Sequence, residues 1–193
     1  MVRELRIYYE GDHKLKPGLH EFLREIREIA QSQRCQFRLI DTDGTPVQDF
    51  RDALKANREA WNVLLLDSDA PHNRSHADLC RSKDIDPAHE GSVFWMVEVM
   101  EAWFLADIES LIQYYGAGFR EDALRGNPEV EKVSKTDVLS RLKRATQATK
   151  PGEYHKTKHA PDLLAAINVG LVRRAAPNCD RLFSLVLAKL SET

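Results

Sequence analysis

The segment NVLLL, residues 62–66, constrains the fold most strongly, because its valine and leucines leave no polar face along the segment. A strand that is apolar on both faces is buried on both sides, which is typical of a parallel sheet covered by helices. The run ends in Asp67-Ser68-Asp69, so two like charges directly follow it. The sequence therefore predicts a central strand of a parallel sheet with a charged carboxyl end.

The segments before this strand alternate between strand and helix patterns. LRIYY at residues 5–9 and CQFRLIDT at residues 35–42 have the composition of strands. Apolar residues from Pro17 to Ala30 recur on one helical face, and TPVQ at residues 45–48 is typical of a helix start. This alternating order predicts an α/β protein with a parallel-sheet core and helices on both faces.

The second half of the chain has mainly helical patterns. SVFWMV at residues 92–97 fits a fourth strand or the start of the helical stretch that follows. The segments expected to be helical are 98–116, 134–146, 161–167 and 178–191. We expect an α/β core over residues 1–115 and a mostly helical, basic extension over residues 116–193, packed on the core as a single compact unit.

Charge is divided unevenly along the chain. Residues 1–130 hold 16 lysines and arginines against 24 aspartates and glutamates, whereas residues 131–193 hold 12 against 6. This division predicts an acidic metal site in the first part and a phosphate-facing surface in the second, or it reflects only solvated helix surfaces. No apolar stretch is as long as a membrane span, and the N-terminal segment lacks the apolar core of a signal peptide, so we expect a cytoplasmic protein.

Carboxylates follow the first and third expected strands. Glu10 comes directly after the first strand, and Asp67 and Asp69 come after the third. Ligands of an open parallel sheet bind beyond the carboxyl ends of its strands, where these three side chains would meet. Mg²⁺ or Mn²⁺ would relieve the repulsion between clustered carboxylates. The alternative is that residues 67–71 form only a turn, since Asp-Ser-Asp before proline is good turn chemistry.

Two other clusters have metal-binding or phosphate-binding chemistry. YHKTKH at residues 154–159 precedes an expected helix start at Pro161; Lys156 and Lys158 are candidate phosphate contacts and His159 a candidate proton-transfer residue. A solvated basic loop is the alternative for this segment. The second cluster has a spacing of four that could present a zinc face on a helix, although its first part is typical of a loop: His72, His76 and Cys80.

The chain resembles known families over nearly its whole length. RIYYEGD and VLLLDSDAP resemble the Toprim domain of topoisomerases, primases and OLD-type nucleases. MVEVMEAWFLAD, KTDVLSRLKRAT and YHKTKHAPDLL are similar to the domain-of-unknown-function family 4276, a Toprim-like group. MEAWFLAD is the most distinctive match.

This resemblance implies a Mg²⁺-dependent phosphodiester chemistry. Glu10 matches a metal ligand or general acid/base, and Asp67 and Asp69 match a metal-binding aspartate pair. Glu101 is the candidate for the further acid of related nucleases, ahead of Glu98 and Asp107. The chain departs from many Toprim sequences in having Ala70-Pro71 where a glycine is common, and in its short first loop.

The resemblance also implies a partner. Small Toprim-like proteins of this kind resemble nuclease effectors that act with an ABC/SMC-like ATPase in bacterial anti-phage defence. The chain contains no Gly-x-x-x-x-Gly-Lys-Ser/Thr motif, so ATPase activity would come from such a partner. The nucleic acid expected as substrate could be DNA or RNA, and a homo-oligomer stays open.

Two rival functions fit the same residues. A phosphoacceptor receiver also places acids after its first and third strands, but it needs an acidic pair after the first strand and a lysine from a late strand. Glu10-Gly11-Asp12 supplies that pair poorly. The other rival is a catalytically silent subunit that binds nucleic acid or a partner and uses the carboxylates to hold a structural ion.

Overall fold

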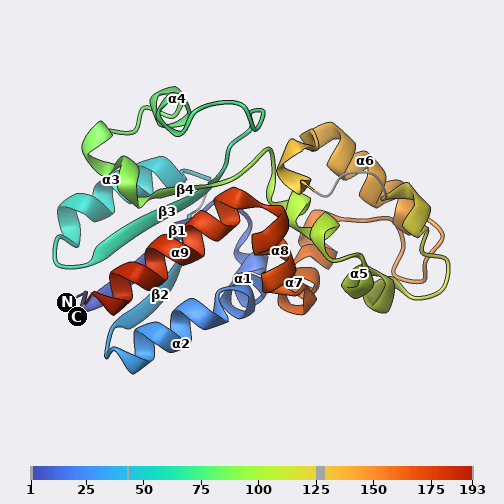
Figure 1. The fold of residues 1–193 in the computed structure, drawn as a ribbon, viewed down its shortest axis with the longest axis horizontal. Helices are drawn as coiled ribbons and strands as arrows, with labels where there is room; N and C mark the ends of the chain where they lie inside the picture. The colour runs from blue at the N-terminus through green and yellow to red at the C-terminus, as the bar shows by residue number, and fades with distance from the viewer. Residues whose placement is uncertain (1, 43, 125–128, 193) are drawn as a thin grey trace.

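The computed structural model describes residues 2–42, 44–124 and 129–192, and its centre is a four-stranded parallel sheet (Figure 1). The strands are β1 (Glu4–Tyr9), β2 (Gln36–Asp41), β3 (Trp61–Asp67) and β4 (Val93–Met96). Their spatial order is β2-β1-β3-β4, so β1 and β3 pair in the middle of the sheet and their carboxyl ends meet at one edge. The predicted parallel sheet and its strands are confirmed, and SVFWMV forms a strand.

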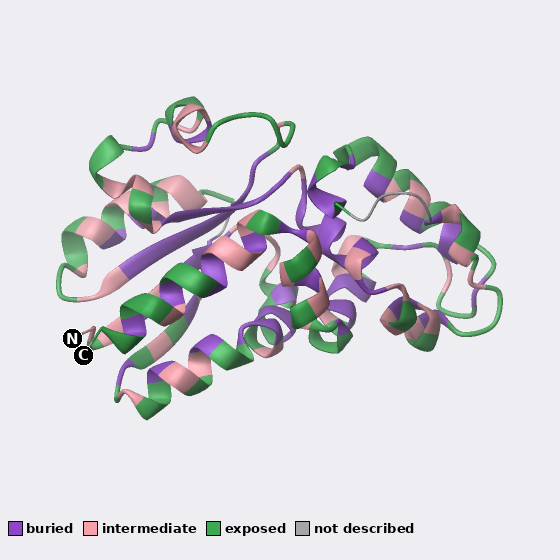
Figure 2. Ribbon diagram, in the orientation of Figure 1, coloured by how far each residue is buried: buried purple, intermediate pink, exposed green. Residues whose placement is uncertain are grey.

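Helices cover both faces of the sheet. Since alternate strand residues point to opposite faces, each strand contributes to two apolar layers. One layer contains α1 (Lys16–Phe22), α2 (Arg24–Ser32) and α9 (Pro177–Ser191), and the other contains α3 (Pro46–Ala56) and α4 (His76–Ser82). Residues 63–66 of β3 are at most 1% exposed, which confirms that this strand is buried on both faces (Figure 2).

The rest of the chain forms short helices. In chain order these are η1 (His13–Leu15), η2 (Pro87–Ser92), η3 (Met100–Ala106), α5 (Ile108–Tyr115), η4 (Glu121–Ala123), η5 (Val130–Lys132), α6 (Lys135–Thr146), α7 (Lys156–Ala166) and α8 (Val169–Ala175). Helices α5 and α6 lie beyond the carboxyl edge of the sheet (Figure 1). One apolar cluster runs from the sheet through η3 to α6 and α7. Across the described ranges, no helix combines the length and the hydrophobicity that a membrane span needs.

The helix boundaries differ from the sequence predictions at four places. The helix expected from Pro17 to Ala30 is interrupted at Leu23, which leaves helical geometry. The stretch expected to be helical from residue 98 opens as the 3₁₀ helix η3 and is separated from α5 by Asp107. Helix α7 starts at Lys156 and contains Pro161 inside it, so the expected start at Pro161 is wrong, and α8 was not foreseen.

A carboxylate and lysine site at the edge of the sheet

The candidate site lies where β1 and β3 end. The chain leaves β1 toward β2 on one side and later returns to β3 on the other, and doubly wound sheets bind ligands at this reversal of strand order. Glu10 follows β1, and its N–H donates to the carbonyl of Leu65 at 2.9 Å. Asp67 is the last residue of β3, and η3 supplies Glu101. The fold therefore brings carboxylates from three segments to one edge.

Asp67 is a buried carboxylate, 4% exposed. Its Oδ1 accepts the N–H of Met100 at 2.8 Å, and its Oδ2 lies 3.7 Å from the Nζ of Lys156. Burial raises the pKa of Asp67 to about 7 against the opposing effect of Lys156, and the charges of Glu101 and Glu10 raise it as well. Near neutral pH this carboxyl group can thus hold or release a proton.

Glu101 is fully buried, with 0% exposure. Its Oε1 accepts the O–H of Tyr154 at 3.0 Å, while its Oε2 has no hydrogen-bond partner in the described part of the chain and lies 3.6 Å from the Nζ of Lys156. Burial and the nearby carboxylate raise the pKa of Tyr154, so its hydroxyl stays a donor. A buried carboxylate oxygen without a donor is costly, and a cation is its natural partner.

Lys156 is the first residue of α7, and its ammonium faces both buried carboxylates. Its side chain is 40% exposed, so it joins the buried pair to the surface. Lys158, on the same first turn, is exposed, and His159 is buried. The Nδ1 of His159 accepts the N–H of His155 at 3.3 Å, so it is also the acceptor for the O–H of Tyr115 at 2.9 Å. Burial lowers the pKa of His159. His159 therefore lies among the rings of Tyr114, Tyr115 and Tyr154.

Asp69 has a different environment from Asp67. It has a positive φ of 48°, and its carboxylate accepts from Lys135 at 2.7 Å and from Lys83 at 3.3 Å. Partial burial opposes these hydrogen bonds, but the two lysines lower the pKa of Asp69. The two aspartates expected to act as a pair thus differ: Asp67 faces Glu101, and Asp69 faces two lysines.

The other two acids considered from the sequence lie at helix starts. Glu98 accepts the N–H of Lys135 at 3.0 Å, at the start of α6. Asp107 accepts the N–H groups of Ser110 at 3.2 Å and Asn168 at 2.8 Å, at the starts of α5 and α8. Both carboxylates stabilise helix ends through their otherwise unpaired N–H groups.

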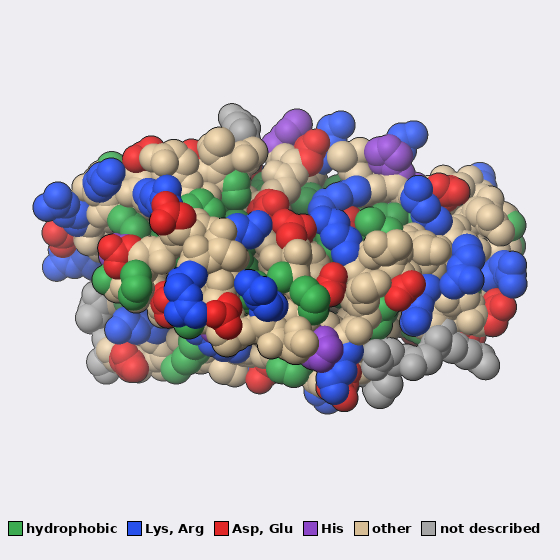
Figure 3. Space-filling view, turned by 90° about the horizontal axis from the view of Figure 1, so that it is seen from above, with side chains coloured by type: hydrophobic (Ala, Val, Ile, Leu, Met, Phe, Trp, Pro, Cys, Tyr) green, Lys and Arg blue, Asp and Glu red, His purple; other side chains and the backbone are tan. Residues whose placement is uncertain are grey.

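Three residues of this arrangement were not foreseen from the sequence: Lys83, Lys135 and Tyr154. Tyr154 is the first residue of the basic segment YHKTKH, two residues before Lys156. Lys135 directly follows the helix cap Ser134, so its place at the start of α6 was readable, but its aspartate partner 66 residues away was not. From above, acidic side chains gather near the middle of the face, with lysine and arginine on both sides (Figure 3).

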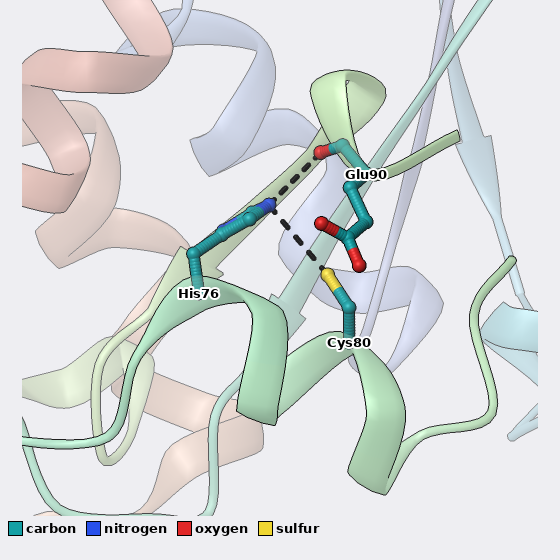
Figure 4. Close-up of side chains that lie close together, drawn as sticks. All are labelled: His76, Cys80 and Glu90. Atoms are coloured by element: carbon teal, nitrogen blue, oxygen red, sulfur yellow. Dashed lines mark hydrogen bonds between the residues drawn. The ribbon is translucent and has the colours of Figure 1, made fainter. Parts of the chain in front are cut away.

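Two of the three residues with the zinc-like spacing, His76 and Cys80, form a separate cluster with Glu90 (Figure 4). The potential ligand atoms of these three residues lie within 4.8 Å of one another. His72 is outside it. The Nδ1 of His76 accepts the N–H of Trp95 at 3.0 Å, so a neutral ring carries its proton on Nε2, which donates to the Glu90 carbonyl at 2.9 Å. Both ring nitrogens are thus engaged. A metal at Nε2 would move the ring proton to Nδ1, and the buried indole N–H of Trp95 would then lose its acceptor. Burial raises the pKa of Cys80 to about 11, which keeps it a thiol. We interpret this cluster as a hydrogen-bonded link between α4, η2 and β4.

The geometry defines a class: a doubly wound α/β protein with buried carboxylates and lysines at the carboxyl edge of its sheet. The chain belongs to the family described as a domain of unknown function (DUF4276), whose model matches residues 12–186. The matched range includes Asp67, Asp69, Glu101 and Lys156. Searches of curated proteins and of solved structures found no match to the chain.

Proposed function

We propose that the chain is a Mg²⁺- or Mn²⁺-dependent nuclease that hydrolyses phosphodiester bonds in DNA or RNA. The observation that carries the proposal is the buried pair Asp67 and Glu101, with one oxygen of Glu101 lacking a hydrogen bond. All available ligand atoms are carboxylate oxygens, which a hard divalent cation prefers. The resemblance of the strand-end motifs to Toprim nucleases supports the same chemistry.

The residues that would hold the cation are Asp67 and Glu101, with Glu10 near enough to Asp67 for its charge to raise the pKa of Asp67. The bound ion would polarise a phosphate oxygen and favour ionisation of a water molecule. The protein fixes the two ligands in advance: the Met100 N–H orients Asp67, and the Tyr154 hydroxyl orients Glu101. Such fixed ligands need little reorganisation when substrate binds.

The lysines supply the complementary charge. Lys156 is partly exposed and can contact a phosphate near the carboxylates as a point charge, and Lys158 lies exposed on the same helical turn. For Asp69 we propose a role in holding Lys83 and Lys135 at the edge, with metal binding as its alternative. His159 stays a candidate for proton transfer, acting through the tyrosine cluster.

The cellular setting is also a proposal. The resemblance favours a cytoplasmic effector of anti-phage defence that is activated by an ABC/SMC-like ATPase. The basic character of residues 131–193 offers a surface for such a partner or for nucleic acid.

A cleavage assay tests the proposed function. The parent protein, Asp67→Asn and Glu101→Gln are incubated with plasmid DNA, single-stranded DNA and structured RNA in Mg²⁺ or Mn²⁺. Glu109→Gln is the control, because it removes an exposed carboxylate from the neighbouring helix α5. We expect both site variants to lose activity by about 100-fold or more, while the control keeps it. Cutting by both site variants at the parental rate would refute the nuclease proposal.

A further inference from the structure

A hollow of about 700 Å³ lies between α3 and residues 81–89, on the face of the sheet that carries α3 and α4. We name it the α3 groove. Its walls include the apolar residues Val47, Leu54 and Ile85. Four cationic side chains line it: Arg51, Lys55, Arg58 and Arg81. Two aspartates, Asp84 and Asp86, line it as well, so the groove combines an apolar surface with a rim of net positive charge.

The cations of the α3 groove are not all neutralised. Arg51 pairs with Asp84 at 2.7 Å, and Arg81 pairs with Asp78. Lys55 and Arg58 are exposed, and neither forms an ion pair with any residue that the structure describes. Two of the four cations are therefore available to an anionic ligand.

The α3 groove continues to the carboxylate edge. A second hollow, of about 410 Å³, shares Val47, Arg51 and Asp84 with the α3 groove and reaches Glu10 and Lys83. A chain molecule that lies in both hollows would therefore run from the exposed cations of α3 to the edge that holds the buried carboxylates. Continuity of this kind favours a polymer over a small ligand.

We infer that the α3 groove holds a single strand of nucleic acid next to the bond that is cut, with phosphates on Lys55 and Arg58 and bases against the apolar wall. This inference rests on the proposed function and names where its substrate lies. Proteins hold single strands in a positively charged groove that follows the backbone while the bases pack on side chains, whereas a duplex would present only its backbone and leave the apolar wall uncovered. Two aromatic rings line this groove: Phe50 is 1% exposed and cannot stack on bases, and His89 is half-buried. We therefore expect phosphate contacts to dominate and binding to depend on salt.

A binding assay tests the inference without relying on catalysis. The probes are fluorescein-labelled oligothymidine and oligouridine strands of about 20 nucleotides and a duplex of the same length. Binding is measured by fluorescence anisotropy in the Asp67→Asn background, with and without the pair Lys55→Glu and Arg58→Glu. The matched control pair is Arg24→Glu and Lys189→Glu, which reverses two exposed cations on the opposite face of the sheet.

The groove pair should weaken single-strand binding by about tenfold or more and reduce the slope of log K against log salt by about 1.4, because two phosphate contacts are lost. The control pair should stay within about twofold of its background. Equal affinity of the groove and control pairs, or preference for the duplex, would overturn the inference. The cleavage assay tests the proposed function separately. Cutting that survives Asp67→Asn and Glu101→Gln refutes the nuclease proposal, and the binding assay still shows whether the α3 groove holds a single strand.

Discussion

Tyr154 gives Glu101 its hydrogen bond, at 3.0 Å in a fully buried setting. Tyr154→Phe keeps the ring and removes the donor, so it leaves a buried carboxylate with a single cation nearby. We expect a loss of about 1–3 kcal/mol in the free energy of unfolding, measured by urea denaturation. Tyr114→Phe is the matched control, because its hydroxyl bonds Asp162 at the surface, and it should cost less than about 0.5 kcal/mol. Equal losses in the two variants would contradict the prediction.

The raised pKa of Asp67, about 7, predicts a pH dependence of stability. The folded state keeps this proton at pH values where the unfolded chain has released it, so this group's contribution to stability falls as pH rises from about 4 to about 7. The slope reaches at most about 1.4 kcal/mol per pH unit. Asp67→Asn removes the titrating group while keeping an oxygen to accept the Met100 N–H.

Urea denaturation of both proteins at several pH values tests this dependence. The difference in unfolding free energy, variant minus parent, should increase with pH across this range and level off above about pH 7. Titrating groups far from Asp67 behave alike in both proteins, so their effects cancel in the difference. A difference that does not change with pH would show that the carboxyl group of Asp67 titrates normally.

The positions of Glu10 and Asp67 could be predicted from the sequence, because strand ends follow from local patterns and parallel strands end at one edge. The environments of the two aspartates could not. Asp69 is two residues from Asp67 in sequence, yet it adopts a positive φ and bonds Lys83 and Lys135 from other elements. Such contacts depend on how α4 and α6 pack, and no local pattern encodes that packing.

At the level of elements, α7 is the helix whose placement matters most, since it starts at Lys156 and packs along α1. Gly18 of α1 makes this packing possible: a Cβ there would lie 2.2 Å from the Pro161 carbonyl oxygen. Alanine normally favours a helix by about 1 kcal/mol over glycine, but here it would push α7 away. We expect Gly18→Ala to destabilise the protein by about 1–3 kcal/mol in urea denaturation.

The control for this prediction is Gly91→Ala, where a Cβ would meet nothing within 4 Å. It should change the free energy of unfolding by less than about 0.5 kcal/mol. If Gly18→Ala were neutral or stabilising, α1 and α7 would pack less closely than the structure has them.

The elements also show where sequence patterns stop being informative. Apolar spacing gave the right face for residues 17–30, but it did not reveal the interruption at Leu23, because an apolar residue fits either geometry. Six of the seven residues of the 3₁₀ helix η3 are apolar, so its sequence has no one-sided pattern that would separate it from an α-helix. The start of α7 at Lys156 was missed because Pro161 is more often found near a helix start than inside a helix.

The whole molecule places its carboxylates at a junction. Asp67 comes from the sheet, Glu101 from η3 and Glu10 from the turn after β1, while Lys135 and Lys156 are the first residues of α6 and α7. The sheet therefore meets η3, α6 and α7 at a cluster of opposite charges. A cation held by both Asp67 and Glu101 would link the sheet to η3 and stabilise the folded state.

A divalent cation should therefore raise the thermal stability of the whole protein if the proposed metal site is correct. At a concentration of 100 times its Kd, the ion stabilises the folded state by about 2.7 kcal/mol, or roughly 5–10 °C for a chain of this length. Thermal unfolding in Mn²⁺ and in chelator measures the shift. Asp67→Asn and Glu101→Gln should abolish it, and Glu109→Gln should keep it.

Lys156→Met sharpens this test, because the lysine ammonium and the cation would compete for the same oxygens of Asp67 and Glu101. The variant should be less stable than the parent in chelator, since two buried carboxylates lose their counter-ion. Its shift on adding Mn²⁺ should be larger than the parental shift, because the ion no longer displaces an ammonium group. A shift no larger in Lys156→Met than in the parent would mean that Lys156 and the metal do not compete, so that the ion binds away from Asp67 and Glu101.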